Sequence, residues 1–129
     1  MLTPAPPDGY AHLLEQPLIA HVAVTAPDGT PRVYPMWFVV DHGRLLFTNT
    51  QGRPQTQWLT DRPHFALSIV DPEDVYRYLG VALDLEGVTP DPTGALYERL
   101  AQRYEVDFRP ADPTDRVVIA ARPTKYWKQ

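Results

Sequence analysis

Residues 47–59, FTNTQGRPQTQWL, bring together groups that can bind an anion where an apolar segment passes into a helix-forming one. Thr48, Thr50 and Gly52 let an anion approach the backbone, and Arg53 can add a bidentate, charge-assisted contact. The first turn of a helix also carries unpaired N–H groups and a partial positive charge. The segment is therefore a candidate phosphate site. By itself it favours a simpler interpretation, in which Thr50 caps the helix and Arg53 lies in solvent.

A second candidate is the segment RVYPMWF, residues 32–38. Pro35 removes a hydrogen-bond donor from a strand, so this edge is open or interrupted. Beside Tyr34 and Trp37, such an edge can offer backbone groups to a planar ring. Ordinary aromatic packing in a dimer interface explains the same residues equally well.

Tyr76, Arg77 and Tyr78 form a third candidate at the start of a strand. Alternation places the two tyrosines on one face and the arginine on the other. They can line the rim of a cofactor or substrate site, or they can be ordinary cross-strand pairs. The histidines show no metal-ligand spacing and the carboxylates suggest no acid–base pair, so we expect no metal site and nominate no catalytic side chain. Any chemistry is then expected to belong to a cofactor.

The composition limits the class of protein. The chain has 129 residues, which suits one domain, here taken as residues 1–129. Cysteine is absent, which excludes disulfides and cysteine-based zinc sites and fits a reducing cytoplasm. The net charge is −4, without a basic cluster, so nucleic acid is not an expected partner. No apolar stretch has the length of a membrane span, and no signal-peptide pattern opens the chain, so we expect no membrane association and a cytoplasmic location.

The hydrophobic pattern predicts a mainly β fold with some helix. We expect short helices near Tyr10–Leu14, over residues 53–62, and from Asp91–Pro92 to about Tyr104. Tight turns such as PDGT and DHGR separate the expected strands, which favours a meander over residues 18–50. The six expected strands span residues 18–26, 31–40, 45–50, 64–71, 76–88 (with a bend at Gly80) and 116–127.

Six strands with tight turns in a short chain predict a small antiparallel barrel with two or three flanking helices. The second strand is apolar on both faces: Val33, Pro35, Trp37 and Val39 alternate with residues that face the other side. A small barrel has only one interior. The outer face must therefore be covered by a helix, a second subunit or a flat ligand.

Three segments carry a further signal through their order and spacing: HVAVTAPDGTPRVYPMWFVVDHGRLLFTNTQGR, WLTDRPHFALSIVDPEDVYRYLGV and DRVVIAARPTK. Together they resemble the pyridoxamine 5′-phosphate oxidase-like family of flavin-binding split barrels, from about residue 10 to residue 127. The similarity is greatest to the short FMN- or deazaflavin-dependent branch. The resemblance implies a homodimer with two cofactor sites at the subunit interface.

The resemblance also implies the residues of the site. The strand at residues 33–37 would lie along the ring of FMN or of the deazaflavin coenzyme F-420, and the helix start would hold the phosphate. Aromatic and arginine residues of the partner chain would close the site. The expected cofactor-binding residues are Tyr34, Pro35, Met36, Trp37, Thr48, Asn49, Thr50, Arg53, Gln55, Thr56, Tyr76, Arg77 and Trp127.

The sequence departs from the family pattern at one position. The family usually has a lysine in a pattern like Arg-x-Lys-Thr, and this chain has Gln55 there. Loss of a charged hydrogen bond, worth about 1.5–3 kcal/mol, weakens binding by roughly tenfold to a hundredfold. The leading hypothesis is a cofactor-dependent oxidoreductase acting on a small organic substrate. The alternative, favoured by Gln55, is a flavin- or haem-binding protein of the same fold without catalysis.

Overall fold

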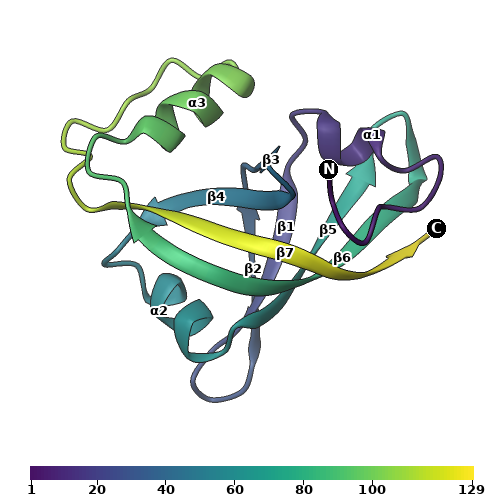
Figure 1. Cartoon of the computed structure of the whole chain (residues 1–129), viewed down its shortest axis with the longest axis horizontal. Helices are drawn as coiled ribbons and strands as arrows, with labels where there is room; N and C mark the ends of the chain where they lie inside the picture. Colours follow the sequence, from purple (N-terminus) through teal and green to yellow (C-terminus); the bar gives the residue numbers. More distant parts are fainter.

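A curved antiparallel sheet and three helices make up the computed structural model, which describes residues 1–129 (Figure 1). The sheet has seven strands in the order β2-β1-β5-β6-β7-β4-β3. Their bounds are β1 (Ala20–Thr25), β2 (Pro31–Met36), β3 (Val39–Asp41), β4 (Arg44–Thr50), β5 (His64–Asp71), β6 (Asp74–Pro90) and β7 (Arg116–Lys128). The helices are α1 (His12–Glu15), α2 (Pro54–Asp61) and α3 (Ala95–Arg103).

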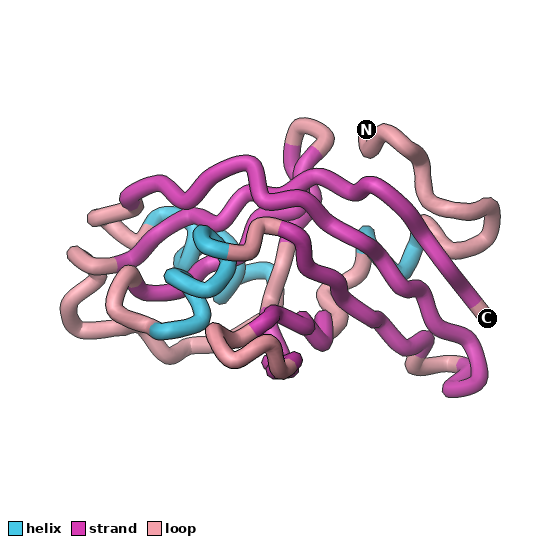
Figure 2. Tube along the Cα trace, turned by 90° about the horizontal axis from the view of Figure 1, so that it is seen from below, coloured by secondary structure: helices cyan, strands magenta, loops and turns pink.

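The long strands β6 and β7 curve along the whole molecule, and the shorter strands complete a split barrel around one core (Figures 1 and 2). Phe47, Phe65, Ile69 and Leu83 lie in this core and are almost fully buried. Burying such side chains is the main favourable term in folding. The predicted mainly β class and split barrel are confirmed. None of the helices is long and apolar enough to cross a membrane.

The predicted single strand over residues 31–40 is wrong, because it divides into β2 and β3, which gives seven strands rather than six. β2 pairs with β1, whereas β3 pairs with β4, so the chain changes partner at Trp37 and Phe38. Side chains of the α3 segment bond the backbone there: Phe38 N–H donates to Tyr104 Oη at 3.1 Å, and Arg103 Nε donates to the Phe38 carbonyl at 3.0 Å. These bonds replace the ladder bonds that a continuous strand would make.

The outer apolar face of this segment is covered in part by α3. Val39 packs with Leu96 and Leu100 of that helix in a small second cluster, which Trp37 borders. Val33 lies beyond the helix and is 61% exposed. The helix is thus one of the expected covers, and β2 keeps an exposed apolar surface.

The bend expected in β6 and the expected start of α3 both lie elsewhere in the structure. The irregularities of β6 fall between Ala82 and Leu83 and between Leu85 and Gly87, not at Gly80. The helix α3 begins at Ala95 rather than directly after Asp91. The Asp91 carboxylate still acts at the helix start, because it accepts hydrogen bonds from Ala95 N–H at 3.2 Å and from the next N–H at 3.0 Å.

Candidate functional site

A cavity of about 290 Å³ opens where the ends of β2 and β4 meet α2, α3 and the start of β7. The sequence segments that form it lie far apart in the chain. The barrel brings them together because β4 pairs with β7 from Leu45 opposite Ala121 to Thr50 opposite Arg116. The residues that line the cavity are Tyr34, Pro35, Met36, Trp37, Thr48, Asn49, Gln55, Tyr97 and Arg116.

One side of the cavity is largely apolar and aromatic. It is formed by residues 34–37 at the end of β2, which is an edge strand of the sheet. Trp37 stacks on Tyr104 with the ring centroids 5.2 Å apart and the planes at 13°. Trp37 also meets Tyr97 at 5.7 Å in a tilted arrangement. Since aromatic neighbours hold the indole in place, this wall is already arranged to receive a planar ring.

The opposite end of the cavity is polar and cationic. Arg116 Nη2 donates to Thr48 Oγ1 at 2.8 Å, and its guanidinium lies over the Tyr97 ring, 4.9 Å from the centroid. In the β4–β7 ladder Arg116 stands opposite Thr50, and Thr48 stands opposite Val118. Diagonal neighbours of this kind share a face of the sheet, which explains why the two side chains meet.

The start of α2 borders the same polar end. Pro54 occupies the first turn, and no side chain caps the helix. The proposed role of Thr50 as a capping side chain is therefore not observed. Instead the Thr50 carbonyl accepts a hydrogen bond from Thr56 Oγ1 at 3.0 Å, and the Thr56 side chain is buried. A helix start without a side-chain cap keeps donors available for an anion.

The loop before α2 is tied to the loop before β7. Gln51 N–H donates to the Asp115 carbonyl at 2.8 Å. Arg116 N–H donates to the Pro113 carbonyl at 2.9 Å, and the Arg116 carbonyl accepts from Asp91 N–H at 2.9 Å. These bonds fix the backbone of Arg116 beside the helix start, so its side chain has a defined direction.

The charge at this end is not balanced by an ion pair within the chain. Burial lowers the pKa of Arg116, and the nearby charge of Arg53 acts in the same direction, whereas Tyr97, Asp115 and Asp91 act against it. Arg116 Nε is buried and has no hydrogen-bond partner. Buried polar atoms normally have partners, so an unpartnered guanidinium nitrogen beside a cavity is a reason to expect an anionic ligand.

The predicted residues at the other end of the sheet do not line this cavity. Tyr76 is 79% exposed. Arg77 donates to the Gly9 carbonyl at 2.9 Å and lies over the Tyr10 ring, so it secures the N-terminal segment. Trp127 packs against Gly80, where an added Cβ would lie 2.0 Å from its Cε2 atom.

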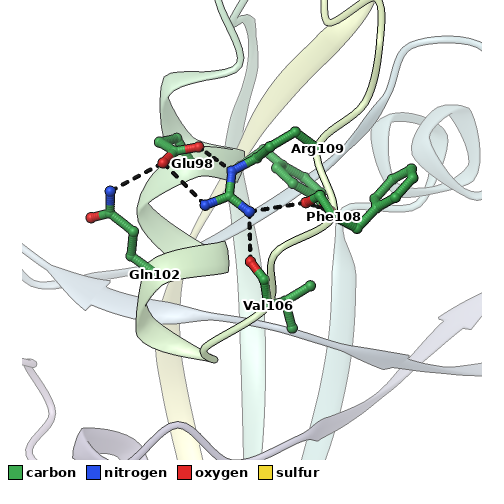
Figure 3. Close-up of polar contacts among 6 residues, drawn as sticks. Glu98, Gln102, Val106, Phe108 and Arg109 are labelled. Atoms are coloured by element: carbon green, nitrogen blue, oxygen red, sulfur yellow. Dashed lines mark hydrogen bonds and ion pairs between the residues drawn. The ribbon is translucent and has the colours of Figure 1, made fainter.

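The α3 wall of the cavity is braced from behind by the loop that follows the helix. Tyr97 Oη donates to the Phe108 carbonyl at 3.2 Å. Arg109 joins Glu98 in an ion pair and donates to the carbonyls of Val106 and Phe108 (Figure 3). These bonds brace the wall, because Arg109 links the helix to its loop at several points.

Sequence reasoning named most of the cavity wall and missed two members, Tyr97 and Arg116. Tyr97 belongs to the apolar stripe of α3, where its spacing indicates core packing only. Arg116 is the first residue of β7, and only the pairing of β7 with β4 places it beside Thr48. The sequence feature that could have indicated Arg116 is its place at the start of a strand, directly after the turn DPTD. Thr50, Arg53 and Thr56 lie next to the cavity without lining it.

Comparison with known proteins identifies the fold. A solved F420 reductase is 46% identical, with a TM-score of 0.91 over 95% of this chain and 99% of that one. A putative pyridoxamine 5′-phosphate oxidase from Listeria innocua is 21% identical, with a TM-score of 0.70 over 94% of this chain and 95% of that one. A pyridoxamine 5′-phosphate oxidase-related, FMN-binding protein from Nostoc punctiforme is 15% identical, with a TM-score of 0.69 over 93% of this chain and 81% of that one. These last two show the fold alone.

No curated protein matches the sequence significantly. The model of the pyridoxamine 5′-phosphate oxidase family matches residues 7–129. That span contains every element of the sheet and every residue that lines the cavity. The chain therefore belongs to the pyridoxamine 5′-phosphate oxidase family.

Proposed function

We propose that residues 1–129 form one cofactor-binding domain of a cytoplasmic oxidoreductase that uses the deazaflavin coenzyme, with FMN as the second candidate. The observation that carries the proposal is the cavity, in which an aromatic wall leads to a cation without an ion pair. A flavin or deazaflavin has the matching shape, a planar ring followed by a phosphate. The deazaflavin coenzyme is preferred because the solved protein at 46% identity is an F420 reductase.

Each part of the cavity then has a task. Residues 34–37 would hold the ring against the open edge of β2, and Trp37 would be kept in place by its two tyrosine neighbours. Thr48, Asn49, the Arg53 side chain and the N–H groups of Gly52 and Gln55 would hold the phosphate. When bound, the cofactor supplies hydride transfer to a small organic acceptor. No side chain of the chain is assigned as acid or base.

A homodimer forms part of the proposal. Val75, Tyr76 and Trp127 leave an exposed aromatic and apolar surface at the end of the sheet away from the cavity. A two-fold axis would bring the same surface of a second copy over the cavity of the first, and would cover Val33 on β2. Tyr76 and Trp127 suit this role better than Arg77, which is held by Gly9 and Tyr10. A monomer by light scattering would contradict this part of the proposal.

The activity is tested by anaerobic mixing of the protein with the reduced deazaflavin coenzyme and, separately, with reduced FMN. Quinones, conjugated enones and nitroaromatic compounds serve as hydride acceptors. The proposal is supported if the rate of cofactor reoxidation rises in proportion to the protein concentration and saturates with the acceptor concentration. The Arg53→Ala variant should require more cofactor for half-maximal rate, because it lacks a phosphate contact. Rates equal to those without protein, for every acceptor, would contradict enzymatic function.

Gln55 supports one alternative, a cofactor carrier without turnover. A carrier binds the oxidised cofactor and protects the reduced ring from acceptors. Tight binding combined with slower reoxidation in the presence of the protein would favour this alternative over the oxidoreductase.

A further inference from the structure

We propose that Arg116 provides the positive charge for the cofactor phosphate that the family obtains from a lysine, at the position where this chain has Gln55. The inference rests on the proposed function, because the anion it concerns is the phosphate of that cofactor. It assigns the role to a residue at the start of β7, far in sequence from the helix start that carries the family pattern.

Arg116 and Gln55 line the same cavity from opposite elements, β7 and α2. Arg116 is anchored to Thr48 by the 2.8 Å bond from Nη2, and it is stacked on Tyr97. These contacts use one edge and one face of the guanidinium. The remaining N–H groups have no acceptor in the chain, and Nε is buried without a partner. A planar fork held in this way suits the bidentate binding of a phosphate.

The other arginines show that this situation is unusual in the molecule. Arg103 donates to three backbone carbonyls. Five arginines form no ion pair, namely Arg32, Arg53, Arg62, Arg103 and Arg116. The remaining ones each form an ion pair with a carboxylate: Arg44, Arg77, Arg99, Arg109 and Arg122.

Of the five arginines without an ion pair, only Arg53 and Arg116 act on the cavity. Arg32 lies over the Trp58 ring, and Arg62 donates to the Pro27 carbonyl, away from the cavity. Arg116 lines the cavity, and Arg53 stands close enough for its charge to lower the pKa of Arg116, although burial is the larger cause. Two neighbouring cations without a paired carboxylate repel each other, and an anion between them would relieve that repulsion.

Gln55 cannot supply this charge itself. Its amide can donate a hydrogen bond to an anion, but it carries no net positive charge. Asp91 and Asp115 act on Arg116 from a distance without forming an ion pair, so they do not occupy its donors. The positive charge of the cavity therefore comes from Arg116 on β7 rather than from a residue of α2.

The test compares cofactors that differ only in the phosphate. FMN is titrated beside riboflavin, and the deazaflavin coenzyme beside its phosphate-free chromophore, by ring fluorescence. Arg116→Gln should weaken binding of the phosphate-bearing partner by about tenfold to a hundredfold and leave the phosphate-free partner unchanged. Adding Gln55→Lys to Arg116→Gln should recover most of the loss. Arg62→Gln removes the same charge elsewhere and should change neither affinity.

The outcomes separate this inference from the proposed function. If Arg53→Ala weakens cofactor binding but Arg116→Gln does not, the proposed function stands and the role of Arg116 is wrong. An equal loss for both members of a cofactor pair would also overturn it, because Arg116 would then only shape the cavity. If Arg116→Gln does not fold, Arg116→Met serves instead, because it also removes the charge, and it should lose affinity for the phosphate-bearing partner alone. A wild-type protein that binds no cofactor overturns both statements.

Discussion

Single side chains hold the turning point between β2 and β3, and Tyr104 is the most important of them. Its hydroxyl donates to the Leu18 carbonyl at 2.7 Å and accepts from Phe38 N–H at 3.1 Å. Burial raises the pKa of Tyr104, so the hydroxyl stays protonated and keeps both roles. Its ring stacks on Trp37, which connects this structural role to the wall of the cavity.

Replacing Tyr104 by Phe should lower the free energy of unfolding by about 1–3 kcal/mol, because two partly buried backbone groups lose their partner. Urea denaturation followed by circular dichroism measures this change. Tyr97→Phe on the same helix is the matched control. Its hydroxyl bonds the exposed Phe108 carbonyl, so its loss should cost about 0.5 kcal/mol or less. Equal effects of the two substitutions would contradict the role given to Tyr104.

Tyr126 gives a prediction for alkaline pH. Burial raises its pKa from 10.0 to about 12, so the folded protein keeps a proton that the unfolded chain has already lost. Its contribution to stability is complete below pH 10 and is lost as the pH rises from 10 to about 12. Tyr126→Phe lacks this ionisation, so its stability should fall less steeply over the same range. Parallel curves for the two proteins in urea denaturation would show that this pKa is not raised.

The strands and helices were predictable where the pattern is local. Alternation identified the barrel strands, and the position of Pro54 identified the start of α2. The division at Trp37 and Phe38 was missed because it depends on bonds from Tyr104 and Arg103, more than sixty residues away. For the same reason Arg116 was missed, since its position beside Thr48 depends on strand pairing rather than on sequence spacing.

The pairing of β6 with β7 places Gly80 opposite Trp127, and this contact leads to a prediction for Gly80→Ala. A Cβ at Gly80 would lie 2.0 Å from Trp127 Cε2, so Gly80→Ala must displace the indole. We expect a loss of about 1–3 kcal/mol in the free energy of unfolding, typical of overpacking, and a red shift of tryptophan fluorescence. Gly87→Ala is the control in the same strand, because nothing lies within 4 Å of the added Cβ. Unchanged fluorescence in Gly80→Ala would contradict the observed packing.

At the scale of the whole molecule, the cavity and the exposed surface of Val75, Tyr76 and Trp127 lie toward different ends of the sheet. The proposed homodimer would explain why residues so far apart resemble parts of one family site. It would also explain why a chain with a well-packed interior keeps large aromatic side chains in solvent. The sequence predicted this arrangement only through its family resemblance, since no spacing rule relates Trp127 to Thr48.

Two altered proteins can test the shared site. Arg53→Ala changes the phosphate end, and Trp127→Ala changes the surface offered to the partner. Each alone should bind cofactor weakly. Refolding them together in equal amounts should restore tight binding at about a quarter of all sites, because mixed dimers contain one intact site each. No recovery in the mixture would place both residues in the site of the same subunit.

The central claim is that the cavity between β2, β4, α2 and Arg116 binds a phosphate-bearing redox ring. The most direct measurement is a fluorescence titration of cofactor-free protein with the deazaflavin coenzyme and with FMN. The account predicts saturable binding of one cofactor for each chain, tighter for the deazaflavin coenzyme, and weakened about tenfold or more by Arg53→Ala. Absence of saturable binding for both cofactors would contradict it, and residues 47–59 would then serve only to join a strand to a helix.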